Sequence, residues 1–145
     1  MKDEPSVLTP RLIVSSAIDA IAFYRAVFGA EELERYATPD GFVVHAMLSI
    51  RGACISLADA RDGWYPPAQS EGAPVLMTLT CEDPDAVAAL AERHGAKILI
   101  PVGDQFYGHR EGRIRDPFGH LWILSRLTKI MTPAEIQKQV DAFDL

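Results

Sequence analysis

The sequence has only two cysteines, no long apolar run and no excess of basic residues, and each shortage excludes a class of protein. Cys54 and Cys81 stand in apolar segments without zinc-site spacing, so we interpret them as buried thiols of a cytoplasmic protein. No stretch approaches the roughly 20 apolar residues that cross a bilayer, and no apolar run of a signal peptide follows the charged start. Fourteen Lys and Arg against 20 Asp and Glu give a net charge of −6, which disfavours a nucleic-acid partner.

What the sequence does contain is an internal repeat. Shifted by 66 positions, residues 19–22 (DAIA) fall on residues 85–88 (DAVA). Further along, residues 52–57 (GACISL) fall on residues 119–124 (GHLWIL) at a shift of 67. Chance matches would not keep so constant a shift, so we interpret the chain as one structural unit built twice.

Apolar spacing and turn residues predict the same order of elements in both copies: strand, helix, then three strands. The predicted fold is therefore α+β, with two βαβββ modules. In the first copy we expect strands at 8–14, 31–38, 42–50 and 53–58 and a helix at 18–28; in the second, strands at 75–81, 97–102, 114–115 and 121–125 and a helix at 84–94.

A separate helix is predicted at the C-terminal end. Thr132 and Glu135 have the spacing of a capping box, and Pro133 stands at the first helical position. We expect this helix to run to about Phe143, with one apolar face that docks on the rest of the chain or on a partner. Its mixed polar face disfavours a role on a membrane surface.

Two motifs resemble those of the vicinal oxygen chelate superfamily. Residues 22–31 (AFYRAVFGAE) are similar to its first helix, and residues 116–122 (DPFGHLW) to its closing hairpin. Residues 104–108 (DQFYG) and 45–48 (HAML) are similar to the PhnB-like, or glyoxalase/bleomycin-resistance-like, branch. The resemblance covers roughly residues 8–126.

The resemblance implies a single domain over residues 1–130, with modules at 8–59 and 75–126 that curve into a cup, and with the last helix in 131–145. It also implies a homodimer. The superfamily includes glyoxalase I, extradiol dioxygenases, fosfomycin-modifying enzymes, and non-catalytic proteins that sequester bleomycin-type antibiotics.

Enzymes of this superfamily take metal ligands from the first and last strand of each module. Counting from the first helix motif, and then by the repeat, places these positions at Thr9, Ser56, Val75 and Ile123. None carries an imidazole or a carboxylate, which zinc, iron, manganese and nickel require. We therefore predict that the protein has no metal site and no cofactor.

Other acidic and basic residues leave few candidates for catalysis. A metal cluster of His45, Asp59 and Glu111 stays open as an alternative. Asp116 stands in an Asp-Pro-x-Gly sequence, which we interpret as a turn in which the Asp accepts a backbone N–H and Gly119 takes a positive φ. No catalytic residue is predicted.

Aromatic residues are expected where a cup would open, and stacking surfaces with a few polar groups suit a flat organic ligand. In the alternative interpretation, Trp122 belongs to the core and the arginines at 110, 113 and 115 form surface ion pairs with Glu111 and Asp116. The predicted ligand-binding residues are His45, Trp64, Tyr65, Phe106, Tyr107, Arg110 and Trp122.

The function predicted from the sequence is metal-free binding of a small organic molecule, such as an aromatic antibiotic or metabolite, by a cytoplasmic homodimer. His45 and Arg110 would orient the ligand. Two alternatives stay open: an isomerase, lyase or dioxygenase, either with relocated metal ligands or using His45 as a metal-free acid–base catalyst, and a protein-interaction domain that uses the last helix.

Overall fold

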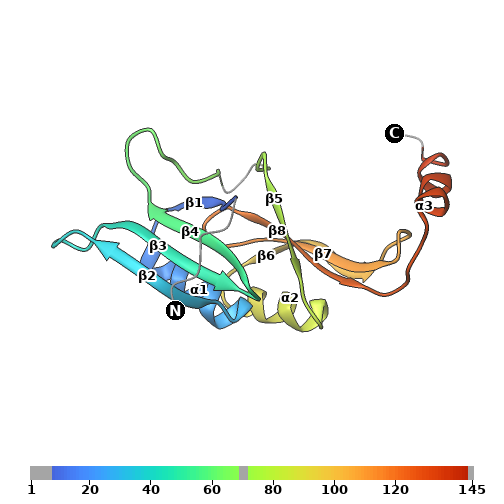
Figure 1. Cartoon of the computed structure of the whole chain (residues 1–145), viewed down its shortest axis with the longest axis horizontal. Helices are drawn as coiled ribbons and strands as arrows, with labels where there is room; N and C mark the ends of the chain where they lie inside the picture. The colour runs from blue at the N-terminus through green and yellow to red at the C-terminus, as the bar shows by residue number, and fades with distance from the viewer. Residues whose placement is uncertain (1–7, 69–71, 144–145) are drawn as a thin grey trace. The chain divides into compact units, whose positions relative to one another are not determined.

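The structure, a computed structural model, describes residues 8–68 and 72–143 (Figure 1). It has the predicted α+β composition, with three helices and two four-stranded mixed sheets. The chain divides into two compact units. Of the described residues, one unit comprises 8–68, 72–74 and 116–120, and the other comprises 75–115 and 121–143.

The first unit contains β1 (Arg11–Val14), α1 (Ala17–Phe28), β2 (Glu31–Ala37), β3 (Val43–Ile50) and β4 (Ala53–Asp59). Its sheet has the order β1-β4-β3-β2, in which β1 is parallel to β4 and the other neighbours are antiparallel. The predicted strand–helix–strand–strand–strand order is confirmed for this half of the chain.

Helix α1 forms where the sequence predicts it because both of its ends carry their own signals. The side chain of Ser16 accepts a hydrogen bond from the Asp19 N–H, and Gly29 ends the helix in the left-handed conformation (φ 68°). Between these caps the helix buries Ile21, Tyr24 and other apolar residues. This buried face forms part of the core of the first unit.

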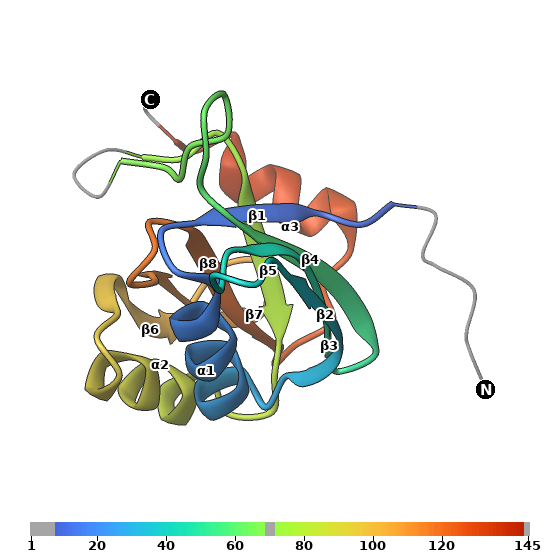
Figure 2. The same ribbon diagram turned by 90° about the vertical axis from the view of Figure 1, so that its left-hand side faces the viewer.

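The second unit repeats this arrangement with β5 (Leu76–Thr80), α2 (Pro84–Arg93), β6 (Lys97–Asp104), β7 (His109–Arg115) and β8 (Leu121–Leu127). Its sheet order, β5-β8-β7-β6, is that of the first unit with each strand replaced by its counterpart. Helix α2 packs on β6, β7 and β8 and covers one face of the sheet (Figure 2). The repeat found in the sequence is thus a repeat of supersecondary structure.

Two strands differ from their predicted bounds by more than two residues. β7 begins at His109, whereas the sequence indicated a strand only at 114–115. Residues 109–113 (HREGR) carry no apolar side chain, so they give no alternation signal, and pairing with β6 and β8 decides their conformation. β1 begins at Arg11 rather than at residue 8, after Pro10, which has no N–H to donate to a neighbouring strand.

The burial of side chains also differs from expectation at two places in the chain. Cys81 is buried as predicted, but Cys54 is only half-buried. Strand alternation alone would place Val43 and His45 on the same face of β3, but Val43 is buried while His45 is only half-buried. The pairing of β2 with β3 is irregular between Tyr36 and Ala37, and this irregularity breaks the simple alternation.

The closing turn at residues 116–120 belongs to the first unit. As predicted, one carboxylate oxygen of Asp116 accepts N–H bonds from Phe118 (2.9 Å) and His120 (3.0 Å). The hydroxyl of Tyr24 donates to the other oxygen. Gly119 has φ +95°, and a Cβ there would lie 2.5 Å from the carbonyl oxygen of Pro67, so the turn requires glycine for both conformation and space.

The last helix, α3 (Pro133–Val140), begins with the predicted capping box but ends at Val140 rather than near Phe143. None of its residues is buried. The Phe143 ring, just beyond the helix, lies 5.0 Å from the ring of Phe106, centroid to centroid. Among the described residues, no helix combines the length and apolarity that crossing a lipid bilayer requires.

Candidate binding cavity

A partly open cavity of about 120 Å³ lies on the second sheet. The side chain of Arg110 on β7 bonds to Asp85 of α2, so it lies on the face of the sheet that α2 covers. Side chains alternate along a strand, so Glu111 and Arg113 point to the opposite face. Both line the cavity. The side chains around it are Ile100, Gln105, Tyr107, Glu111, Arg113 and Ile123.

Hydroxyl groups satisfy the carboxylate of Glu111 in this cavity. Tyr107 donates to one oxygen, and Ser125 donates to the other at 2.7 Å. His109 places its Nδ1 3.1 Å from the Ser125 Oγ. Burial, and then the hydrogen bond to Glu111, raise the pKa of Tyr107 to about 12, so its phenol stays protonated and keeps donating at neutral pH.

Arg113 stands between two apolar neighbours. In the register of the sheet it lies opposite Ile100 of β6 and Ile123 of β8. Its Nε is buried and has no hydrogen-bond partner in the described part of the chain. The cavity therefore contains a cationic side chain with a donor that the described protein groups do not use.

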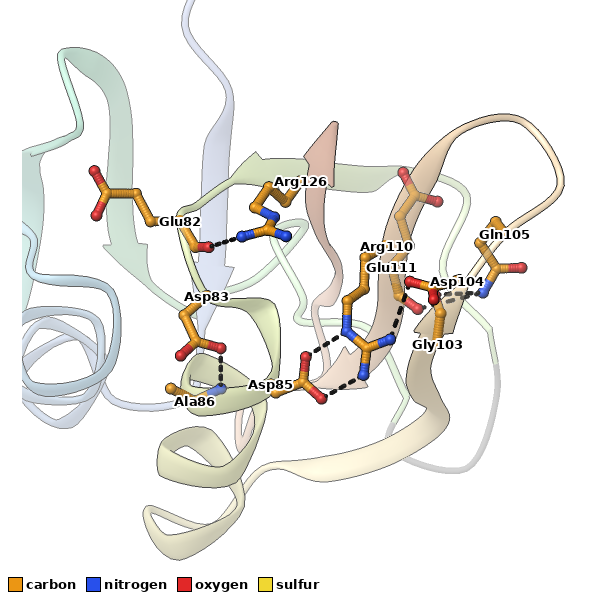
Figure 3. Close-up of polar contacts among 10 residues, drawn as sticks. All are labelled: Glu82, Asp83, Asp85, Ala86, Gly103, Asp104, Gln105, Arg110, Glu111 and Arg126. Atoms are coloured by element: carbon orange, nitrogen blue, oxygen red, sulfur yellow. Dashed lines mark hydrogen bonds and ion pairs between the residues drawn. The ribbon is translucent and has the colours of Figure 1, made fainter. Parts of the chain in front are cut away.

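Arg110, the arginine that the sequence analysis selected, is fixed on the other face of β7 (Figure 3). It donates two hydrogen bonds of 2.7 Å to Asp85 and one of 3.0 Å to Asp104. The hydrogen bonds from Arg110 hold the pKa of the Asp85 carboxyl below its usual value. The alternative pairing of Arg110 with Glu111 is wrong, because the two side chains leave opposite faces of the strand.

On the first sheet, the predicted residues His45 and Trp64 both contact Arg11. The guanidinium of Arg11 lies 2.9 Å from His45 Nδ1 and 5.5 Å from the centre of the Trp64 ring. Because arginine only donates, Nδ1 accepts, and the Nε2–H of His45 donates to Glu34 at 2.9 Å. Arg61 lies 4.3 Å from the same indole ring. Both ring nitrogens of His45 are thus engaged, Nδ1 by Arg11 and Nε2 by Glu34.

The remaining predicted residues lie in different environments. Phe106 packs edge-to-face on Tyr107, with 4.9 Å between ring centroids. Tyr65 is 70% exposed, whereas Trp122 is only 3% exposed and belongs to the buried layer, as the alternative interpretation had it. Trp122 offers no accessible ring face in this structure, so we leave it out of the cavity.

The residues at the family's metal positions do not fit a metal ion. Thr9 and Val75 precede β1 and β5 and are not part of these strands. On the last strand of each module, Ser56 lies opposite Arg11 of β1, and Ile123 lies opposite Thr78 of β5. These side chains supply a guanidinium, two hydroxyls and a hydrocarbon, but no imidazole and no carboxylate. Within residues 8–68 and 72–143, no three His, Cys, Asp or Glu side chains are grouped to hold a metal ion.

The alternative metal cluster of His45, Asp59 and Glu111 gains no support, because each of these side chains forms hydrogen bonds with other protein groups close to it. The Asp59 carboxylate accepts N–H bonds from Ala17 (2.6 Å) and Val43 (2.8 Å), which joins α1 to the sheet of the first unit. His45 and Glu111 are held by the contacts described above.

Sequence reasoning missed most of the cavity residues. Arg113 was named among the arginines of the alternative surface ion pairs but not among the ligand-binding residues, and Gln105, Glu111, Ile100 and Ile123 were not proposed as ligand-binding residues either. The signal that would have found Glu111 and Arg113 is the alternation of β7. That signal becomes visible only once residues 109–113 are known to form a strand.

Comparison with known proteins confirms the family resemblance. The model of the glyoxalase/bleomycin resistance protein/dioxygenase superfamily matches residues 7–124, and the chain belongs to this superfamily. An uncharacterized protein of Mycobacterium bovis is 38% identical over 139 residues, which cover 92% of this chain and 91% of the relative.

Solved structures share the fold. TioX from Micromonospora sp. ML1 superposes with a TM-score of 0.67 at 24% identity, covering 84% of this chain and 98% of TioX. A PhnB protein from Bacillus cereus also gives a TM-score of 0.67, at 21% identity, covering 83% of this chain and 99% of that protein. These similarities confirm the fold class predicted from the sequence.

Proposed function

We propose that this protein reversibly binds a small, partly aromatic organic molecule, such as an antibiotic or a toxic metabolite, and sequesters it without a metal ion. The observation that carries the proposal is the composition of the cavity on the second sheet. There the apolar walls of Ile100 and Ile123 and the ring of Tyr107 meet the polar groups of Gln105 and Arg113. Apolar walls with a few convergent polar groups are typical of small-molecule sites.

The size of the cavity limits what it holds. Its volume of about 120 Å³ is smaller than the roughly 300–1,000 Å³ of sites that enclose drug-sized molecules. We expect it to hold a single ring or a short side chain of the ligand, with the rest of the ligand outside. Each well-placed aromatic contact adds about 0.5–1.5 kcal/mol beyond burial. Binding in the micromolar range is therefore expected.

Two further observations are consistent with sequestration, and the first of them disfavours metal catalysis. The positions that would carry metal ligands offer no imidazole or carboxylate. The name of the superfamily whose model matches includes bleomycin resistance proteins as well as enzymes.

Elemental analysis and titration calorimetry test the proposal. We expect freshly purified protein to contain no stoichiometric transition metal. We also expect it to bind bleomycin, or another member of an aromatic compound panel, equally well before and after treatment with EDTA. Mass spectrometry should recover the ligand unchanged, and backbone amide shifts should map to Tyr107 and Arg113.

Other outcomes would support the alternatives. A tightly bound metal whose removal abolishes binding, or conversion of the ligand, would support an enzyme. Absence of binding across the panel, together with association through α3, would support a protein-interaction domain.

A further inference from the structure

We infer that the cavity on the second sheet selects organic anions, small carboxylates attached to an apolar body, and that Arg113 is the residue that selects them. This inference rests on the proposed function, because it specifies the ligand class of the same cavity. The sequence favoured Arg110 as the cation that orients the ligand. In the structure, Arg113 lines the cavity and takes this role instead.

Arg113 carries a hydrogen-bond donor that no described protein group uses. A buried polar atom without a partner is rare in folded proteins and marks a place where a ligand or an ion completes the hydrogen bonds. Arg113 Nε is such an atom in the described part of the chain. A guanidinium presents its donors in a planar fork that matches the two oxygens of a carboxylate. Nε is covered in this structure, so a carboxylate in the cavity would satisfy this unpaired donor after a rotation of the Arg113 side chain that turns Nε toward it.

The other polar side chains that face the cavity are hydrogen-bonded to groups other than Arg113. Glu111 is the acidic neighbour, and it would repel an anion if its oxygens competed for Arg113. Both of its oxygens instead accept hydroxyl hydrogen bonds, from Tyr107 and from Ser125, and His109 Nδ1 lies 3.5 Å from the second oxygen. The amide nitrogen of Gln105 is turned to the backbone oxygens of Gly103 and Glu111.

Arg113 lies between apolar side chains on both neighbouring strands. Its registered neighbours on both sides are the isoleucines of β6 and β8, and both line the cavity. Apolar flanks lower the local dielectric and strengthen a charge-assisted hydrogen bond relative to one in water. They also provide walls for the ring or alkyl body next to the carboxylate. The geometry thus favours a ligand with an anionic end and an apolar end.

Benzoate and benzamide test the inference, because they have similar shapes and differ in charge. We expect benzoate to bind the full-length protein at least tenfold more tightly than benzamide by titration calorimetry, with the largest NMR shift at the Arg113 Nε–H. Arg113→Met should reduce benzoate binding to the level of benzamide, and Arg113→Lys should keep part of the preference, because lysine retains charge without the planar fork.

Arg126→Met is the matched control. It removes the same charge from β8, where the Arg126 side chain donates to the carbonyl oxygen of Glu82 (Figure 3). It should leave the preference for benzoate unchanged. Thermal melts of all variants establish that they are folded, and Arg113→Lys still tests the inference if Arg113→Met is not.

Equal binding of benzoate and benzamide at the cavity would overturn anion selection while leaving the proposed function in place. Retention of the full preference by Arg113→Met would overturn the role of this residue. Failure of benzoate to shift any cavity residue would also overturn the inference. In that case the panel experiment above would decide the proposed function separately.

Discussion

Arg110 and Arg113 are three residues apart on one strand and carry the same side chain, yet their surroundings differ. Arg110 is bound by two carboxylates, and Arg113 faces a cavity with an unused donor. Because side chains alternate along a strand, an odd separation places the two residues on opposite faces. At the residue scale, the face of the strand decides what each arginine can do.

Tyr107 is expected to ionise only at high pH. Burial, and then its hydrogen bond to Glu111, raise its pKa to about 12, above the ordinary value of 10.0. A group whose pKa is higher in the folded state contributes stability that is full below pH 10 and is lost as the pH rises through 12. A titration followed at the tyrosinate absorbance should lose the contribution of one late-ionising tyrosine in Tyr107→Phe. An undiminished late transition in this variant would contradict the assignment.

Tyr24→Phe is expected to destabilise the protein by about 1.5–3 kcal/mol, because it removes a buried hydrogen bond to a carboxylate. The Tyr24 side chain is fully buried, and Asp116 is 1% exposed. Urea denaturation measures the change. Tyr36→Phe is the control, because the Tyr36 hydroxyl bonds to Glu34 in an exposed position, and its loss should cost less than about 0.5 kcal/mol. Equal effects of the two substitutions would contradict the prediction.

At the scale of elements, helices and turns were predicted better than strands. Helix α1 and the turn at Asp116 carry their signals within a few residues, in caps and in side-chain-to-backbone hydrogen bonds. β7 carries no such signal, because its first five residues are polar or glycine. Its conformation depends on two neighbouring strands, and the charged face that it presents to the cavity was therefore mostly missed.

Gly112 is expected to tolerate no side chain. A Cβ at this position would lie 2.7 Å from the Val102 Cγ2 and 2.9 Å from the Val102 backbone nitrogen, where the pairing of β6 with β7 is irregular. Gly112→Ala should therefore destabilise the protein by about 1–3 kcal/mol through overpacking.

Gly103→Ala is the matched control on β6, since the nearest atom to its Cβ would be 4.0 Å away. Thermal unfolding of the two variants tests the comparison. A Gly112→Ala variant as stable as Gly103→Ala would show that β6 yields without cost.

At the scale of the whole molecule, α3 makes little contribution to the core. Deleting residues 133–145 should lower the free energy of unfolding by less than about 1.5 kcal/mol. Among the described residues, the deletion removes no buried residue of α3 and one aromatic contact, between Phe106 and Phe143. Urea denaturation of the full and shortened chains measures this. A larger loss would mean that the helix supports the fold.

The same deletion tests the homodimer that the sequence analysis proposed. We expect light scattering to give the mass of a dimer for the full chain. If the exposed apolar residues of α3, such as Val140, contact the second copy, the shortened chain should be a monomer. A shortened chain that remains a dimer would place the interface elsewhere.

The sequence alone determined the repeat, the ends of α1 and α2, the start of α3, the closing turn and the superfamily, because these depend on residues close together in the chain or on motifs that keep their spacing. Tertiary structure alone decided which side chains line the cavity. A residue faces the cavity only through the pairing of its strand with others far away in the sequence, and a single irregularity in that pairing changes the alternation. For this reason Tyr107 could be selected from the sequence as a ligand-binding residue, whereas Arg110 was chosen in the place that Arg113 occupies.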